Sequence, residues 1–160
     1  MPLQRPISSL PACDANGNLF QVKVSVVPMT KALAEQWHAN VQPIVNSHYS
    51  HEGATNRKVR GDVGSRWPTY LKLVAIHNYL TRMPGNASEK GKALCVVVSK
   101  GQQKFPIGML SIVPKLHCNI QGVERQRAFT WYLSDAPSEA YEQLLGQPAV
   151  RGVAKALIDC

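Results

Sequence analysis

The pattern of apolar and polar residues in the first third of the chain predicts a strand followed by a helix. Residues 20–26 alternate between apolar and polar side chains, which is the period-two pattern of a half-buried strand. Thr30 can cap a helix in which apolar residues recur at helical spacing, namely Leu33, Trp37, Val41, Ile44 and Val45. Pro43 should end or bend this helix near its last turn.

A second helix is predicted after a glycine- and arginine-containing loop. Ser65 can cap it, Pro68 fits its first turn, and its apolar stripe consists of Tyr70, Leu73, Ile76, Leu80 and Met83. Pro-Gly-Asn at residues 84–86 should stop it. We expect Trp37 and Tyr70 in the core, and we expect Trp67, at the helix start, to be the most exposed aromatic residue.

The second half of the chain predicts three strands and a final helix. Residues 93–98 form a continuous apolar run, typical of a strand buried on both faces, so a helix must cover each face. Residues 107–113 should form its antiparallel hairpin partner, and residues 127–133 a fourth strand after the break at Gly122. A short helical turn over 138–145 and a helix from about residue 151 follow. The order β-α-α-β-β-β-α indicates an α+β fold.

The length of 160 residues suits one domain. Residues 1–18 are rich in proline and turn-forming residues and predict a flexible N-terminal tail, which leaves residues 19–160 as a single domain. The chain has no apolar run approaching the ~20 residues of a membrane span and no secretory signal at its start, so we expect a cytoplasmic protein, with secretion as an effector left open. The four cysteines form no C-x-x-C pair, which favours reduced thiols over a metal site.

The formal charge of +8 favours an anionic partner, which could be nucleic acid, a membrane surface or a phosphorylated cofactor. The densest basic stretch consists of Arg57, Lys58, Arg60 and Arg66. No aromatic residue lies between Arg57 and Arg66 to stack on a base. We therefore interpret this stretch as a solvated surface loop and expect neither a nucleic-acid nor a membrane partner.

The segment from Arg151 to Leu157 is the strongest candidate for a ligand site. It places a small-residue turn directly before a helix, and such a turn presents free backbone N–H groups to a phosphate. Gly152 and Ala154 leave room for close approach. Arg151 and Lys155 can add charge-assisted contacts.

This element order, with a glycine-containing turn after the fourth strand, resembles the GNAT superfamily of N-acetyltransferases over about residues 19–160. The acyl-CoA motif of that family is Arg or Gln, two residues, Gly, one residue, then Gly or Ala. Residues 149–154 match it at Gly152 and Ala154, and Ala149 stands where Arg or Gln is usual. The resemblance implies a GNAT-like, mostly antiparallel central sheet in a chain that would end after the third main helix of that fold.

The resemblance also implies site residues and an activity. The pyrophosphate of acetyl-CoA, the co-substrate, would bind at Arg151, Gly152, Val153, Ala154 and Lys155. Leu133 and Ser134 would lie beside its pantetheine arm, with the N–H of Leu133 or a neighbour polarising the thioester carbonyl. Candidates for the catalytic base are Asp135, Glu139 and His117. The acceptor would be an amine of a small molecule or of a protein lysine.

Other readings of the chemistry are weaker. His48, His51 and Glu52 could suggest a metal site, but histidines beside Gly53 are more typical of a polar loop, and we expect no metal. His117 cannot readily activate Cys118, because adjacent side chains on a strand face opposite ways.

The alternative function is a non-catalytic, basic interaction or effector protein with a partial GNAT-like fold. In that case a free strand edge could pair with a partner chain or with a second copy.

Overall fold

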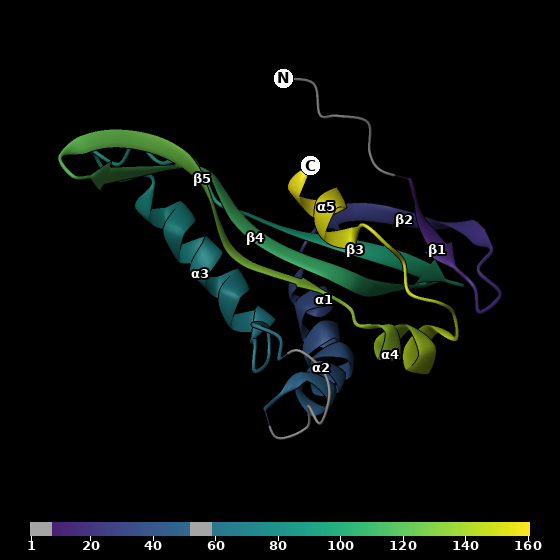
Figure 1. The fold of residues 1–160 in the computed structure, drawn as a ribbon. Helices are drawn as coiled ribbons and strands as arrows, with labels where there is room; N and C mark the ends of the chain where they lie inside the picture. Colours follow the sequence, from purple (N-terminus) through teal and green to yellow (C-terminus); the bar gives the residue numbers. More distant parts are fainter. Residues whose placement is uncertain (1–7, 52–58) are drawn as a thin grey trace.

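The computed structural model describes residues 8–51 and 59–160 of the chain. It is an α+β fold with a curled, five-stranded antiparallel sheet in which the strands neighbour one another in chain order (Figure 1). The strands are β1 (Ser9–Cys13), β2 (Leu19–Pro28), β3 (Lys92–Lys100), β4 (Gln103–Ile120) and β5 (Val123–Asp135). The helical elements are α1 (Lys31–Gln36), η1 (Trp37–Val41), α2 (Gln42–Tyr49), α3 (Trp67–Leu80), α4 (Ser138–Ala140), η2 (Tyr141–Leu145) and α5 (Val153–Ile158).

Strand β3 is buried on both faces, as its continuous apolar run predicts. Cys95 and Val97 belong to a core shared with α1, η1, α2 and α3 on one face of the sheet. Val96 and Val98 alternate with them and belong to a second core on the opposite face, where α5 and η2 pack. Helical segments therefore cover each face of the strand, and the prediction is confirmed.

The N-terminal segment contributes a strand where a tail was expected. Ser9–Cys13 pairs antiparallel with β2, from Ser9 opposite Lys23 to Cys13 opposite Leu19. Ala12 is fully buried in the core beside α5. The prediction of a flexible tail is wrong from Ser9 onward, and its first seven residues lie outside the described part of the chain.

Pro43 does not end the first helix, which continues from Lys31 to Tyr49 through the π-helical segment η1. Thr30 caps it as predicted, because its hydroxyl accepts a hydrogen bond from the Leu33 N–H at 3.2 Å. The wider turn of η1, closed by the Gln42 N–H to the Trp37 carbonyl, directly precedes Pro43. A π-turn at this point accommodates a residue that has no N–H to donate.

Helix α3 packs with a different face from the one predicted. Trp67 and Val74 are its buried residues, with Tyr70 half-buried beside them. Leu73, Ile76 and Leu80, which we expected to form a core-facing stripe, are each at least 40% exposed. Trp67 is fully buried, so the prediction that it is the most exposed aromatic residue is wrong.

Strands β4 and β5 are longer than predicted and form a two-stranded ribbon that extends past the first residue of β3. The pairing of β3 with β4 stops where Lys92 lies opposite Ile112, whereas β4 continues to Ile120. The tip is a tight turn at Gln121 and Gly122, both with positive φ. In the described residues, no helix is long and apolar enough to cross a membrane.

Candidate functional site

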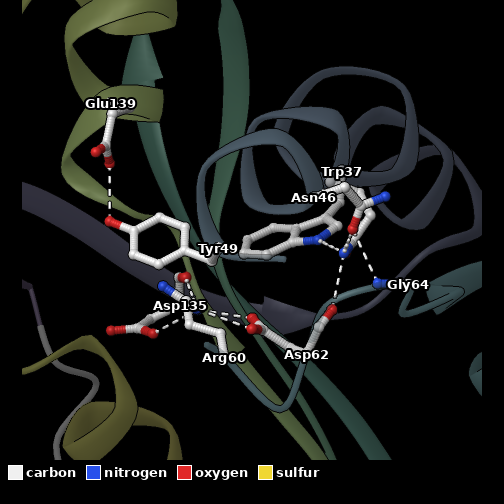
Figure 2. A network of polar contacts seen from close by, with 9 residues as sticks. Trp37, Asn46, Tyr49, Arg60, Asp62, Gly64, Asp135 and Glu139 are labelled. Carbon is white, nitrogen blue, oxygen red and sulfur yellow. Dashed lines mark hydrogen bonds and ion pairs between the residues drawn. The ribbon is translucent and has the colours of Figure 1, made fainter. Parts of the chain in front are cut away.

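A network of charged and polar side chains lies where β5 ends (Figure 2). The Arg60 guanidinium forms a two-point contact with the Asp62 carboxylate, at 2.8 and 2.6 Å. It also contacts the Asp135 carboxylate at 3.1 Å and the Asp135 carbonyl at 2.7 Å. One cation therefore joins the segment after α2 to the last residue of β5.

Tyr49 and Glu139 extend the network on the other side of Arg60. The Arg60 guanidinium lies 5.4 Å from the centre of the Tyr49 ring, within the range of a cation–π contact. The Tyr49 hydroxyl is 3.0 Å from the Glu139 carboxylate, to which it can donate a hydrogen bond. Glu139 is only 9% exposed, whereas Asp135 keeps half of its side chain open to solvent. Of the two carboxylates, Asp135 is the one that a ligand can reach.

The electrostatics of the network favour a permanently charged Arg60. Burial opposes its charge, but hydrogen bonding and attraction to Asp62, with further attraction to Asp135, outweigh the burial and raise its pKa. Burial, and then the charge of Asp135, raise the pKa of the nearby Tyr141 phenol. Arg60 is thus a fixed cation that orients carboxylates on either side.

The segment that carries Arg60 and Asp62 is anchored to the first helix. The Gln42 amide donates to the Asp62 carbonyl at 2.8 Å and accepts from the Trp37 indole N–H at 3.0 Å. The Asn46 side chain accepts from the Gly64 N–H at 2.8 Å. Gln42 and Trp37 are buried, so these contacts are shielded from water and hold the segment in place.

Helix α5 brings the predicted phosphate-binding turn to the same end of β5. Gly152 caps the helix in the left-handed conformation, with φ of 79°. A Cβ on Gly108 of β4 would collide with the Val153 side chain, so the helix start lies directly on Gly108. Gly108 pairs with Asp135. The Gly152 turn and the Arg60 network therefore lie near the same end of β5, but α5 packs on one face of the sheet and α2, which anchors the Arg60 segment, packs on the other.

The structure brings the predicted phosphate-binding residues 151–155 together at the start of α5, but these residues differ in whether their polar groups already have a partner. The first hydrogen bond within α5 runs from the Ala156 N–H to the Gly152 carbonyl, so the N–H groups of residues 153–155 have no partner inside the helix. The Arg151 N–H donates to the Pro11 carbonyl at 2.8 Å and is not free for a ligand. Lys155 is ion-paired with Asp159. An open groove of about 400 Å³ adjoins the turn on the β1 side.

Leu133 and Ser134 lie on opposite faces of β5. Leu133 packs against the core beside α5. Ser134 is buried, and its hydroxyl has no hydrogen-bond partner among the described residues. Ser134 thus has a buried hydroxyl without a hydrogen-bond partner in the described chain, whereas Leu133 has no polar side-chain atom.

His117 lies far from the other predicted site residues. It is nine residues beyond Gly108 along β4, roughly 30 Å for an extended strand. Its ring nitrogen is 3.5 Å from the Glu124 carboxylate, and the backbone N–H of His117 donates to the Ser88 hydroxyl. The structure therefore separates His117 from Asp135 and Glu139, which it places in one network.

Sequence reasoning missed Arg60, Asp62 and Tyr49 as site residues and assigned Arg60 to a solvated loop. The short spacing from Arg60 to Asp62 could have indicated a local ion pair. The contact from Arg60 to Asp135 joins residues 75 positions apart, and a single sequence contains no pattern that predicts it. Arg57, Lys58 and Glu52 lie outside the described residues.

The described residues contain no cluster of three or more histidine, cysteine or acidic side chains arranged to hold a metal. All four cysteines are free thiols. Comparisons with protein-family models, with curated proteins and with solved structures found no match. The function must therefore be argued from the geometry of this chain.

Proposed function

We propose that the protein is an acyl-CoA-dependent N-acyltransferase, with acetyl-CoA as donor and an amine of a small molecule or a protein lysine as acceptor. The observation that carries the proposal is the convergence at the end of β5. The Gly152 turn of α5 lies on Gly108, and the accessible carboxylate of Asp135 lies on the strand paired with Gly108. An anion site on the α5 face of the sheet and a proton acceptor held from the α2 side thus lie near the same end of β5.

The residues around α5 fit a phosphate-bearing donor. The start of a helix carries a partial positive charge, and the N–H groups of residues 153–155 point away from the helix without an internal partner. The space where a Gly152 Cβ would point is empty. Arg151 is exposed and supplies a cation for the pyrophosphate. The GNAT resemblance of the element order adds to this support.

Asp135 is the residue that we assign to accept the proton of the acceptor ammonium. Its side chain is 53% exposed, so an amine can approach it, and Arg60 holds it from the side of α2. Glu139, hydrogen-bonded to Tyr49, is the second carboxylate of the same network. Backbone N–H groups near Leu133 would polarise the acyl carbonyl. Bound acetyl-CoA would supply the activated thioester.

The test begins with binding. Acetyl-CoA at a hundred times its Kd should stabilise the protein by about 2.7 kcal/mol, which for a chain of this size is a rise in Tm of about 5–10 °C. Gly152→Glu should abolish this rise because its carboxylate would occupy the phosphate position. Gly122→Glu is the matched control, since Gly122 has φ of 80° and equally open surroundings at the far ribbon tip.

Turnover is tested separately. Release of free thiol from acetyl-CoA in the presence of a panel of amines should be lost in Asp135→Asn while the acetyl-CoA-induced rise in Tm is kept. No rise in Tm at millimolar acetyl-CoA, or equal loss of the rise in Gly122→Glu and Gly152→Glu, would contradict the proposal.

A second candidate function is a non-catalytic, basic interaction protein. The exposed apolar face of α3 beside the open edge of β5 favours it. It predicts partner binding without thiol release, so the thiol assay distinguishes the two functions.

A further inference from the structure

Helix α3 presents an apolar face that nothing in the described chain covers. Leu73, Ile76, Leu80 and Met83 are spaced so that they share one side of the helix and its extension, and each is 40–55% exposed. A contiguous apolar surface of this kind is uncommon on a monomer and marks an interaction site.

The neighbouring strand adds aromatic residues to the same surface. Tyr132 pairs with Ser111 and stacks on Tyr70 of α3 at 3.5 Å, so its side of the sheet faces α3. A bulge in β5 then turns the adjacent Trp131 toward α3 as well, where it meets His77 edge-on at 5.2 Å. Two consecutive residues that would otherwise face opposite ways thus lie on one side.

Together these elements form an open groove of about 290 Å³, which we call the α3–β5 groove. Its lining residues are Leu73, Ile76, His77, Leu80, Trp131 and Tyr132. Strand β5 is the last strand of the sheet in the described chain, so the N–H and C=O groups on its outer edge are unpaired beside the groove. Figure 1 shows α3 running along this side of the β4–β5 hairpin.

The two segments of the chain that form the groove carry predominantly positive charge. Residues 67–83 contain Lys72 and Arg82 and no acidic residue. Strand β5 carries Arg125 and Arg127, and its one acid before Asp135 is Glu124. In the described part of the chain none of these four cations has an ion-pair partner.

We propose that the α3–β5 groove docks an extended, acidic segment of a partner protein, which adds a strand to the outer edge of β5. Main-chain hydrogen bonds to β5 supply affinity, and alternate apolar side chains of the segment enter the groove. Its acidic residues meet the unpaired cations of α3 and β5. A second copy of this chain is a poorer occupant, because it would bring a further +8 and two more arginines of β5 to the same edge. This proposal does not depend on acyl transfer.

The test uses a ten-residue peptide of alternating glutamate and valine with blocked ends. We expect saturable binding, followed through tryptophan emission, because Trp131 is the only one of the three tryptophans that is not fully buried. We also expect slower amide hydrogen exchange at the outer edge of β5. A peptide with lysine in place of glutamate, and a peptide N-methylated at alternate amides, should each bind at least tenfold more weakly. These two comparisons do not require any change to the protein.

Protein variants locate the site. Ile76→Glu should weaken peptide binding at least tenfold, whereas Ile158→Glu, at a site of nearly identical exposure on α5, should leave it unchanged. Lys72→Glu should weaken it severalfold, with the exposed Lys23 of β2 changed to Glu as the control.

Four results would overturn the proposal: no binding, equal binding of the lysine peptide, a dimer abolished by Ile76→Glu, or tighter binding of a single-stranded oligonucleotide at the same residues.

Discussion

Replacing Gly108 by alanine should lift α5 away from the sheet. An added Cβ would clash with the Cγ1 methyl of Val153 and lie 3.1 Å from Cδ1 of Leu157. Both side chains are buried, so neither can turn toward solvent to make room. Inserting a methyl group into such a core costs about 1–3 kcal/mol. A cost of about 2 kcal/mol lowers Tm by roughly 4–8 °C for a chain of this size.

Urea unfolding followed by far-UV circular dichroism measures this cost. Gly61→Ala is the matched control, because Gly61 has no atom within 4 Å of its Cβ position and does not need a positive φ. Its stability should be unchanged or rise slightly. Val153→Ala combined with Gly108→Ala should recover part of the loss, since removing the Val153 methyls makes room for the new one. The packing of α5 on Gly108 would be refuted if Gly108→Ala unfolded at the same urea concentration as the unmodified protein.

Two further changes test the ion network and the buried thiol. Arg60→Leu leaves the Asp62 carboxylate, which is 9% exposed, without its two-point partner, and should lower the free energy of unfolding in urea by about 2 kcal/mol. Asp135→Asn removes an exposed contact and should lower it by less than about 1 kcal/mol. Equal losses in the two variants would contradict this difference. Burial raises the pKa of Cys95 from 9.0 to about 12. Between these values the unfolded thiol loses its proton and the folded one keeps it, so stability should fall by about 1.4 kcal/mol per pH unit as pH rises through this window. Cys95→Val should show a shallower fall, and a parallel pH profile would exclude the thiol as the cause.

The sequence was most informative where burial is periodic. The alternation in β2 and the apolar run of β3 gave the correct strands, because each pattern reflects which faces of the sheet are covered. It was least informative where strands are exposed. Residues 115–120 of β4 do alternate between polar and apolar side chains, but they lie beyond the strand that was predicted over 107–113, whereas residues 123–126 of β5 are exposed and carry no apolar alternation. Strand β1 is short and contains Pro11, which made it look like part of a tail.

Helix α3 illustrates a limit of a different kind. It has two apolar sides, and periodicity alone cannot decide which one faces the sheet. The bulky Trp67 and the small Val74 fill the core, whereas the longer stripe through Ile76 remains outside. The candidate site shows the same limit, since Asp135 and Glu139 were predicted from their position after β5 but their partner Arg60 required the fold.

The chain-order arrangement of the strands has a consequence for how the protein folds. Strands β3, β4 and β5 form a meander with short connections, and β1 with β2 form a local hairpin. The β2–β3 pairing, from Val24 opposite Val98 to Pro28 opposite Leu94, is the exception, because all the residues of α1 to α3 lie between the two strands. Closing so long a loop is entropically costly before its contacts form. Joining the hairpin to the meander along the β2–β3 seam is therefore the step that should limit the folding rate.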